Sequence, residues 1–375
     1  MLKRGMFVIM KILILTNHSY MLYRFRRELI QRLATEHEVV LSMPFVGHEQ
    51  NFMDMGLRCI ETKMGRRDVK PTDELKLFFT YFQLLRKERP DRVITYSIKP
   101  NIYGGLCCRL LGIPYYANVQ GLGTAFQMPK LKKAVTVLYR EALRKVNMVF
   151  FENESNAAIF RDRAIVPLNR QTVLPGAGIN LKEYPFVPYP DNKRFHYLYL
   201  GRIMREKGVN ELFDAARLLF EKYGNCFVLD IVGFFDYEDF TNQIRELEDL
   251  GIAVFHGFQS DPRPYYQNAD CVLVPSYHEG MSNVLLEAAA TGRPLITTDI
   301  PGCAETVDHG TTGLICKVKD RDSLLACMEQ MLLTSKADRV AMGIAGHEKM
   351  VREFNRELVV SRIIRTIFPE GGAKQ

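Results

Sequence analysis

The chain has 375 residues, of which 47% are hydrophobic and 25% charged, so it can bury a substantial core and is not a disordered protein. Its 26 glycines and 17 prolines follow no repeat, which excludes collagen-like and low-complexity classes. The length suggests two domains, and no uninterrupted apolar run approaches the ~18–20 residues that span a bilayer.

Charge is unevenly distributed along the chain. Residues 1–185 hold 29 Lys and Arg against 16 Asp and Glu, a net +13, whereas the remainder holds 21 against 27, a net −6. We infer that two domains face different environments. The basic front half is expected to bind an anionic partner, such as a phospholipid surface, a polyphosphate or a nucleic acid.

The eight cysteines show neither a Cys-x-x-Cys pair nor a Cys/His spacing typical of zinc sites, so we expect no metal. Cys226 and Cys271 lie in strand-like segments and are interpreted as small core residues. A chain of this size does not depend on disulfides, which favours a reducing, cytoplasmic compartment. The opening MLKRGMFVIM is interpreted as a leader to the first strand, with Met6 or Met10 as alternative starts.

The first half of the chain alternates short apolar runs with helical patterns. Lys11–Thr16 predicts a buried strand, and a helix from Leu22 to Leu33 follows a polar loop. Strands that alternate with helices predict right-handed crossovers and a parallel sheet. Further strands are expected at 38–43, 92–96, 115–119 and 148–151, and further helices at 72–89, 101–111, 130–145 and 155–163.

Residues 174–195 are rich in proline and glycine without periodicity, which indicates a linker. A second α/β series follows this linker. Its strands are expected at 197–200, 227–232, 253–255, 271–274 and 294–297, and its helices at 209–223, 237–250, 283–291 and 322–333.

We therefore predict an α/β protein of two Rossmann-like α/β/α domains, residues 1–185 and 186–355, with parallel sheets. The last helical stretch, 356–368, comes too late for the second sheet, so we expect the C-terminal helix of 356–375 to pack back on the first domain. In open parallel sheets, ligands bind beyond the carboxyl ends of the strands. The residues directly after strands, facing an interdomain cleft, are therefore candidates for the site.

The first candidate motif follows the strand at 197–200 and reads Gly201-Arg202-Ile203-Met204-Arg205-Glu206-Lys207-Gly208. Gly201 permits a close backbone approach, and Arg202 and Lys207 flank a short loop ahead of a helix. A guanidinium, an ammonium and helix N–H groups together suit a diphosphate. From spacing alone, a solvated basic loop is an equally good interpretation.

The second motif follows the strand at 271–274 and carries Glu279 and Glu287. Glu287 shares one face of the predicted helix with Asn283, among Val, Leu and Ala, where a carboxylate is costly to bury without a partner. A sugar diol is such a partner, because a carboxylate accepts from two hydroxyls at once. An exposed Glu on an ordinary helix is the alternative. The N–H groups that can meet a phosphate or sugar oxygen at the helix start belong to Gly280, Met281, Ser282 and Asn283.

Together, GRIMREKG and PSYHEGMSNVLLEAAATGRPLITTDIPGCAE resemble the family 4 glycosyltransferases, in the branch that assembles capsular and lipid-linked oligosaccharides. SIKPNIYGGLCCRLLGIP, NVQGLGTAF and LPGAGIN fit this branch too, so the resemblance covers nearly the whole chain. It implies the GT-B fold and a retaining, metal-independent transfer of a hexose or N-acetylhexosamine. The donor would be a UDP-sugar, which is a substrate and not a cofactor, and the acceptor a polyprenyl-diphosphate-linked glycan.

The resemblance also implies roles for the two motifs. Arg202 and Lys207 would clamp the diphosphate and, together with Glu279, form the catalytic group. Glu287 would bind the ribose hydroxyls, and Glu279 with the amides of 280–283 would hold the donor sugar. No side chain is expected to act as a covalent nucleophile. The leaving phosphate oxygen would take the acceptor proton on the same face, stabilised by the two cations and the helix N–H groups.

The base and acceptor assignments rest on fewer residues. Gly257 and Phe258, with His256, would contact the base. The first domain departs from many relatives, which carry a Gly-rich first loop and a central His, because its loops read Asn17-His18-Ser19-Tyr20 and Gln120-Gly121-Leu122-Gly123. Candidates for the cleft and the acceptor's phosphates, with a solvated basic face as the alternative for the charged ones, are Asn17, Arg24, Arg26, Lys99, Gly121 and Gly123.

The segment KLKKAVTVLYREALRK at 130–145 predicts a basic amphipathic helix, a kind that lies on anionic membranes. We hypothesise that the first domain docks peripherally on the inner face of the membrane to reach its acceptor. Packing of the apolar stripe against the first sheet is the alternative. The apolar residues concerned are Leu131, Val135, Leu138 and Leu143, with Phe78, Phe79, Tyr81 and Phe82 on the helix at 75–85.

Other functions would require other sequence features. A nucleotide-sugar 2-epimerase of the same fold stays an alternative, which a measurement of sugar transfer to a lipid acceptor would separate. An NAD-dependent dehydrogenase is rejected, because residues 121–126 lack the third glycine of its fingerprint. Asp320-Arg321-Asp322 mimics a metal-binding Asp-x-Asp but falls at a helix start, where Asp is a favoured cap. Nucleic-acid binding is disfavoured, because the strongest motifs lie in the acidic half.

Overall fold

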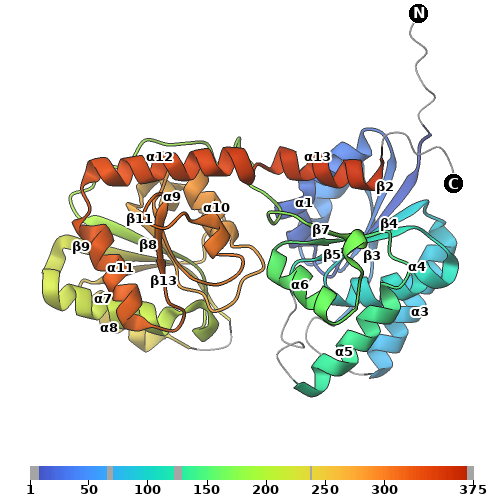
Figure 1. Ribbon diagram of the computed structural model, residues 1–375, viewed down its shortest axis with the longest axis horizontal. Helices are drawn as coiled ribbons and strands as arrows, with labels where there is room; N and C mark the ends of the chain where they lie inside the picture. Colours follow the sequence, from blue (N-terminus) through green and yellow to red (C-terminus); the bar gives the residue numbers. More distant parts are fainter. Residues whose placement is uncertain (1–7, 66–70, 122–128, 237–238, 370–375) are drawn as a thin grey trace, which may run out of the picture. The chain divides into compact units, whose positions relative to one another are not determined.

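The computed structural model describes residues 8–65, 71–121, 129–236 and 239–369. The chain forms two compact units, each a parallel sheet with helices on both faces (Figure 1). Unit 1 runs to Ala177 and includes the chain again from Val359, and unit 2 comprises Gly178–Leu358. Most of the predicted leader and Gly123 lie outside the described residues.

The sheet of unit 1 has seven strands in the order β3-β2-β1-β4-β5-β6-β7. All neighbours pair in parallel, and the strands predicted from the sequence are confirmed. β3 and β7 were not predicted, because these short outer strands are only partly buried and carry no apolar run. The strands are β1 Lys11–Leu15, β2 Glu38–Met43, β3 Arg58–Glu61, β4 Arg92–Tyr96, β5 Tyr115–Val119, β6 Met148–Phe151 and β7 Gln171–Val173.

Helices cover both faces of this sheet. α3, α4, α5 and α6 share one apolar core with it, and α1, α2 and α13 share the other. The bounds are α1 Ser19–Ala34, α2 Glu49–Asp54, α3 Pro71–Glu88, α4 Gly105–Leu111, α5 Pro129–Ala142, α6 Glu154–Asp162 and α13 Arg356–Ile367, with a π-helical turn η1 Pro100–Gly104 and a 3-10 turn η3 Leu168–Arg170.

The predicted apolar stripe at 130–145 is divided between the core and the surface. Leu143 is buried and Val135 packs against the same core, so these two face the sheet and the membrane interpretation was wrong for them. The same holds for Tyr81 of α3, which is fully buried. No helix in the described part of the chain is both long and apolar enough to cross a membrane.

The sheet of unit 2 has six parallel strands in the order β10-β9-β8-β11-β12-β13. β8 and β9 are nine residues long and pair along their whole length. The sequence analysis placed the ends of both strands too early, because a glycine follows each apolar run, at positions 201 and 233. The strands are β8 Phe195–Ile203, β9 Phe227–Phe235, β10 Ala253–Gly257, β11 Cys271–Val274, β12 Leu295–Thr298 and β13 Gly313–Cys316.

One long helix of unit 2, α12, was not predicted, because its segment contains glycine, which disfavours helices. Its Gly343 lies so close to Gly292 that a Cβ would stand 2.2 Å from the Gly292 carbonyl oxygen, so the glycine permits close packing on the end of α10. The helices are α7 Val209–Tyr223, α8 Thr241–Asp249, α9 Arg263–Asn268, α10 Asn283–Ala290, α11 Arg321–Leu333 and α12 Lys336–Glu353, with 3-10 turns η4 Arg205–Lys207, η5 Gly224–Cys226 and η6 Ala304–Thr306.

Most of the predicted linker packs on unit 2. Ile179 and Tyr184 are buried in its core. The Val187 N–H donates to the Thr291 carbonyl at 3.2 Å, which attaches the segment to the end of α10. The segment is thus a structural part of unit 2 as well as a connection.

All eight cysteines are free thiols. Cys271 is buried in β11 as expected, whereas Cys226 is exposed, because it ends the turn η5 before β9 begins. Burial raises the pKa of the Cys316 thiol to about 12, so this side chain behaves as an inert core residue.

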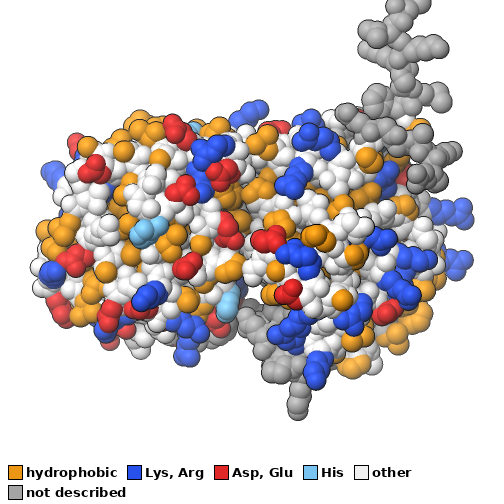
Figure 2. All heavy atoms as spheres, in the orientation of Figure 1, with side chains coloured by type: hydrophobic (Ala, Val, Ile, Leu, Met, Phe, Trp, Pro, Cys, Tyr) orange, Lys and Arg blue, Asp and Glu red, His pale blue; other side chains and the backbone are white. Residues whose placement is uncertain are grey.

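The charge asymmetry of the sequence is visible on the surface. On the face drawn in Figure 2, Lys and Arg side chains gather over unit 1, while Asp and Glu are mixed among them over unit 2.

Both sheets reverse their strand order at one point, between β1 and β4 in unit 1 and between β8 and β11 in unit 2. At such a point the two adjoining loops leave in opposite directions and open a crevice beyond the strand ends. The connections concerned are residues 16–18 and Ser97 in unit 1, and residues 204–208 and 275–282 in unit 2. Both predicted motifs of unit 2 therefore meet at its switch point.

Candidate active site

The site of unit 2 is built from the loops that follow β8 and β11. The two loops are joined through the backbone, because the Tyr277 N–H donates to the Glu206 carbonyl at 2.9 Å. Gly208 has a φ of +70°, and a Cβ on it would stand 2.1 Å from the Pro275 carbonyl oxygen. Only glycine fits this position, which brings the basic loop directly against the acidic one.

Lys207 and Glu279 form the ion pair at the centre of the site. Lys207 Nζ lies 2.5 Å from Glu279 Oε1, and the Ser276 hydroxyl donates to the same oxygen at 2.9 Å. Both charged side chains are partly buried, with 19% and 16% of their surface exposed. An ammonium has three donors, and a carboxylate has a second oxygen. Each group can therefore bind a ligand without leaving its partner.

Arg202 lies at the same edge of the sheet but has a different partner. Its guanidinium donates to Asp236 Oδ2 at 2.6 Å, and its side chain is 45% exposed. The Tyr199 hydroxyl donates to the Arg202 carbonyl at 2.6 Å. Burial raises the pKa of Tyr199; Glu279 adds to this rise and Arg202 opposes it, so the phenol lies within the field of both charges. The structure thus brings Lys207 and Glu279 into contact, while Arg202 is held by Asp236.

Helix α10 begins directly after the acidic loop. Ser282 occupies its N-cap position, but the serine side chain makes no capping hydrogen bond. Asn153, Asp320 and Ser335 do make such bonds at the starts of α6, α11 and α12. The first N–H groups of a helix have no partner within it. The start of α10, with Asn283, therefore offers donors and a positive potential beside Lys207 and Glu279.

The loop before α10 is held by the chain around Gly302. The Ser282 N–H donates to the Gly302 carbonyl at 2.8 Å, and a Cβ on Gly302 would stand 2.5 Å from the Gly280 carbonyl oxygen. Met281 is 7% exposed and its side chain belongs to the core beneath α10. Met281 can therefore meet a ligand only through its backbone.

Glu287 is buried within α10, with 6% of its surface exposed. Its Oε2 accepts a hydrogen bond from the Tyr266 hydroxyl at 2.9 Å. Part of the hydrogen-bonding capacity of the Glu287 carboxylate is thus used within the protein. Glu287 differs in this from Glu279, which is paired with the Lys207 ammonium.

The candidate base contacts lie at the ends of β9 and β10. Phe258 is exposed and packs edge to face against Phe234, with ring centroids 5.9 Å apart. Gly257 has a φ of +65° with open space around its Cα. The His256 ring is hydrogen-bonded to Asp230 Oδ1 at 2.7 Å. Of residues 256–258, Phe258 therefore has the aromatic surface best placed to contact a base.

In unit 1, Asn17 lies at the switch point between β1 and β4. Its side-chain oxygen accepts from the Ser97 hydroxyl at 2.7 Å, which links the two loops there. Gly121 lies two residues after β5, and among the described residues no atom would stand within 4 Å of a Cβ built on it.

The three basic candidates of unit 1 have different environments. Arg26 is 3% exposed and donates to Glu152 at 2.6 Å, so its assignment to the acceptor's phosphates was wrong: the guanidinium is buried and paired with a half-buried carboxylate. Arg24 is half-buried on α1. Lys99 donates to Glu74 at 2.6 Å.

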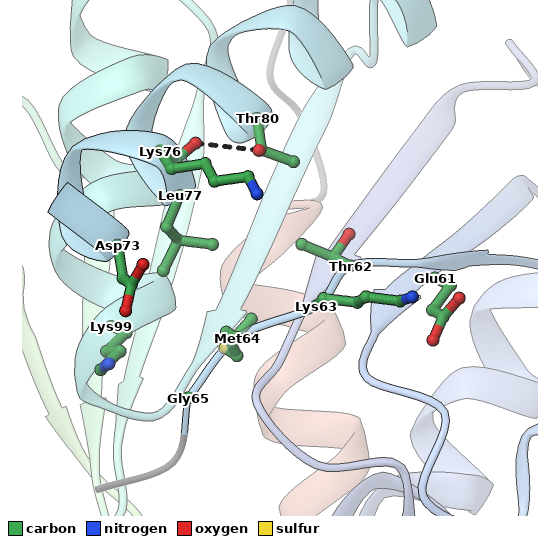
Figure 3. A pocket seen from close by; sticks show the side chains of 10 residues that line it. All are labelled: Glu61, Thr62, Lys63, Met64, Gly65, Asp73, Lys76, Leu77, Thr80 and Lys99. Atoms are coloured by element: carbon green, nitrogen blue, oxygen red, sulfur yellow. Dashed lines mark hydrogen bonds between the residues drawn. The ribbon is translucent and has the colours of Figure 1, made fainter. Parts of the chain in front are cut away.

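Lys99 also lines a cavity of about 470 Å³ between the end of β3 and α3. Figure 3 shows Lys76 and Leu77 of α3 on one side and the segment from Thr62 to Gly65 on the other. The wall carries Lys63, Lys76 and Lys99 together with Glu61 and Asp73, so its charge is mixed.

The Asp-x-Asp sequence at 320–322 is a helix cap. Asp320 accepts from the Ser323 N–H at 2.9 Å at the start of α11. Among the residues that the structure describes, no group of three or more His, Cys, Asp and Glu side chains could hold a metal ion.

Three residues of the site were missed from the sequence. Asp236 directly follows β9, so the strand-end rule that singled out Glu279 could have found it if the end of β9 had been placed correctly. Ser276 lies two residues after β11, in the same loop as Glu279, so the same rule applied to it. Tyr266 had no such signal, because it lies 21 residues before Glu287 on the short helix α9, which the pattern did not predict.

Family comparisons agree with the two-unit structure. The family described as "Glycosyl transferase 4-like" matches residues 11–153, and "Glycosyl transferases group 1" matches residues 194–334. The chain belongs to the family 4 glycosyltransferases. The match to group 1 spans both motifs of the transferase's unit 2 site.

Among similar proteins is a Campylobacter jejuni enzyme named N,N'-diacetylbacillosaminyl-diphospho-undecaprenol alpha-1,3-N-acetylgalactosaminyltransferase. It is 27% identical over 376 residues, covering 95% of this chain and 98% of that one. An Escherichia coli enzyme named UDP-Gal:alpha-D-GlcNAc-diphosphoundecaprenol alpha-1,3-galactosyltransferase is 25% identical, covering 73% and 75%. The crystal structure of Anabaena HepE in complex with UDP and glucose has a TM-score of 0.77 at 15% identity, covering 96% and 99%. The transferase thus has the GT-B fold.

Proposed function

We propose that the transferase moves a hexose or N-acetylhexosamine from a UDP-sugar to a polyprenyl-diphosphate-linked glycan, with retention of configuration and without a metal ion. The observation that supports donor binding is the Lys207–Glu279 pair beside the start of α10, where the Ser282 side chain makes no capping hydrogen bond, at the switch point of unit 2. The acceptor class is supported by two relatives whose names specify diphospho-undecaprenol-linked sugars.

In this proposal each donor group has its own part of the site. Lys207 and the first N–H groups of α10 bind the diphosphate, and Arg202 joins them by leaving Asp236. Glu279 accepts from donor-sugar hydroxyls through Oε2 while its Oε1 stays bonded to Lys207 and Ser276. Glu287 binds the ribose, and Phe258 lies against the base.

The proposed reaction needs no covalent enzyme intermediate. The bond between the anomeric carbon and the phosphate oxygen breaks, and the acceptor hydroxyl oxygen bonds to that carbon on the same face. The hydroxyl proton passes to the departing phosphate oxygen. Lys207, Arg202 and the α10 amides stabilise the negative charge that develops on the diphosphate, which is electrostatic transition-state stabilisation.

Unit 1 is proposed to bind the acceptor. Asn17 and Gly121 lie just beyond strand ends, where ligands of parallel sheets bind. Lys99 at the rim of the unit 1 cavity, together with Arg24, is proposed to bind the acceptor's phosphates.

We further propose that unit 1 docks peripherally on the inner, anionic face of the cytoplasmic membrane through its α3–α4–α5 layer. α4 contacts both α3 and α5, and each helix exposes apolar side chains beside basic ones. Apolar groups inserted among basic groups suit a surface of anionic lipids. The exposed apolar residues are Leu75 and Phe79 on α3, Leu110 on α4, and Val137 and Leu138 on α5.

The test is a transfer assay with the full chain. Labelled UDP-, GDP- and ADP-sugars are offered with a polyprenyl-diphosphate-linked sugar in detergent, with and without a chelator, and the anomeric configuration of the product is determined by NMR. We expect transfer from one UDP-sugar, unaffected by the chelator, with the donor's configuration retained. Transfer only from another nucleotide, an inverted product, or loss of activity with chelator would each overturn the corresponding part of the proposal.

The same assay decides between transfer and 2-epimerisation. An epimerase would convert the UDP-sugar to its C2 epimer without an acceptor. We expect no such conversion, since the family and the relatives favour transfer.

A further inference from the structure

Glu287 accepts a hydrogen bond from the phenol of a buried tyrosine, Tyr266. The carboxylate lies on a helix whose neighbouring residues, Leu286 and Ala288, are buried core residues. A carboxylate in such surroundings is costly without hydrogen bonds. The Tyr266 hydroxyl supplies one of them at 2.9 Å, from a side chain that is itself fully buried.

Tyr266 is in turn fixed from outside α9. Arg293 Nε donates to the Tyr266 carbonyl at 2.9 Å, and Arg293 Nη2 donates to the carbonyls of Val187 and Pro188 at 3.0 and 2.9 Å. Arg293 has no exposed surface. The ring of Tyr184 meets the Tyr266 ring edge to face at 6.2 Å. The phenol therefore occupies one set position against α10.

We propose that Tyr266 is a positioning residue for Glu287, which aims the carboxylate at the ribose diol and thereby makes the site selective for ribonucleotides. This inference rests on the proposed function, in which Glu287 binds the ribose. A carboxylate can accept about four hydrogen bonds through its two oxygens, so the bond from Tyr266 does not by itself fill the acceptor capacity that ligand hydroxyls would use. A carboxylate held in advance loses less entropy on binding than one that must be ordered by the ligand.

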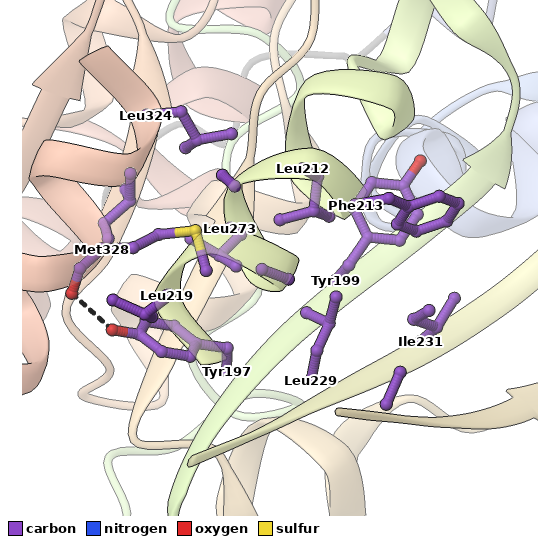
Figure 4. Packing of buried hydrophobic residues seen from close by; sticks show 14 of the residues in the cluster. Tyr197, Tyr199, Leu212, Phe213, Leu219, Leu229, Ile231, Leu273, Leu324 and Met328 are labelled. Carbon is purple, nitrogen blue, oxygen red and sulfur yellow. Dashed lines mark hydrogen bonds between the residues drawn. The ribbon is translucent and has the colours of Figure 1, made fainter. Parts of the chain in front are cut away.

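The experiment compares UDP with its 2′-deoxy and 3′-deoxy analogues by titration calorimetry on the full chain. Tyr266→Phe removes only the hydroxyl, and Glu287→Gln removes the charge that the ribose is proposed to meet. Tyr197→Phe is the matched control. Tyr197 is equally buried and donates to the Met328 carbonyl in the core on the opposite face of the same sheet (Figure 4).

Tyr266→Phe should weaken UDP about five- to tenfold, as expected for one hydrogen bond, and leave the deoxy analogues nearly unchanged. The preference for UDP over at least one deoxy analogue should fall by the same factor. Glu287→Gln should abolish that preference, and Tyr197→Phe should leave it intact.

The failures are distinguishable. If Glu287→Gln retains the full preference, the ribose role of Glu287 fails, and the proposal for Tyr266 fails with it. If Glu287→Gln loses the preference while Tyr266→Phe keeps it, only the positioning role is overturned. If Tyr266→Phe weakens UDP and its analogues equally, the tyrosine supports the fold without orienting the carboxylate, which also overturns the inference.

Discussion

Lys207 and Glu279 are bonded at 2.5 Å although they come from separate loops, 72 residues apart in the chain. The bond fixes the ammonium beside the start of α10, where a diphosphate is proposed to bind. Lys207→Ala should therefore lower kcat/KM about 10²–10⁴-fold, because charge stabilisation of the leaving group is lost. Steady-state kinetics would measure it, with Lys182→Ala, at an exposed position of unit 2, as control. Turnover near that of the unchanged enzyme would refute the site.

Glu279→Gln separates sugar binding from nucleotide binding. The amide keeps an acceptor but loses the charge that holds donor-sugar hydroxyls in the proposed function. We expect kcat/KM with the UDP-sugar to fall about 10²-fold, while the Kd of UDP, which lacks the sugar, changes only a few-fold. Equal losses for UDP and UDP-sugar would place the role of Glu279 at the nucleotide.

Gly208→Ala tests the contact between the two loops. Gly208 and Gly251 have nearly the same φ, +70° and +72°, but only at Gly208 would a Cβ meet another atom, the Pro275 oxygen at 2.1 Å. Gly251→Ala should therefore cost about 1–2 kcal/mol of unfolding free energy, from the left-handed backbone alone. Gly208→Ala should cost about 4 kcal/mol or more, because the loops must separate. Denaturant unfolding of both variants gives the comparison, and equal losses would contradict the tight contact.

Glu88 links three elements of unit 1 and should make its stability depend on pH. Burial raises the pKa of Glu88, but two Arg58 hydrogen bonds of 2.8 Å, the Arg58 charge and Lys11 outweigh it, so the pKa is lowered from 4.5. The unfolded chain binds a proton first as pH falls. The stabilisation is therefore complete above about pH 4.5 and lost as pH falls through the lower, folded pKa.

Glu88→Gln is the corresponding variant. It should lower the unfolding free energy by about 1 kcal/mol at pH 7, and the difference from the unchanged protein should shrink below about pH 4. Thermal melts across this range measure it, with the exposed Glu36→Gln as control. A difference that is independent of pH would show that the charge of Glu88 does not contribute.

The proposed membrane surface predicts a charge-dependent association. Lys133→Glu with Lys145→Glu reverses two exposed charges, one on α5 and one in the turn that follows it, and should reduce sedimentation with phosphatidylglycerol vesicles several-fold at low salt. Lys182→Glu with Lys193→Glu makes the same charge change at exposed positions of unit 2 and should have little effect. If both pairs reduce sedimentation equally, net charge is responsible and the α3–α4–α5 layer is not the docking surface.

The fold was predictable from the sequence wherever the local pattern of apolar residues shows that a segment is buried. The inner strands are apolar runs, and their alternation with helices fixes a parallel sheet, so strands such as Cys271–Val274 were located to the residue. Elements whose stability comes from partners distant in sequence were missed. The helix α12 is an example, since its Gly343 is explained only by contact with Gly292.

The candidate site divides in the same way. Lys207 and Glu279 were found because both follow strands, and the sheet order brings those strand ends together. The partners that fix the site, Asp236 for Arg202 and Tyr266 for Glu287, depend on strand length and helix placement. Arg26 shows the opposite error, because nothing in its sequence context indicates that Arg26 is buried and paired with the carboxylate of Glu152.

Helix α13 has a practical consequence. It begins at Arg356 in unit 2, yet its Val359, Ile363 and Ile367 belong to the core of unit 1. Unit 1 is thus assembled from two separate stretches of chain. A gene cut once between the units would give a front fragment with an uncovered apolar face, prone to aggregate. Chimeras that exchange nucleotide specificity between related enzymes should instead replace residues 178–358 as an insert and keep the final helix with its original front half.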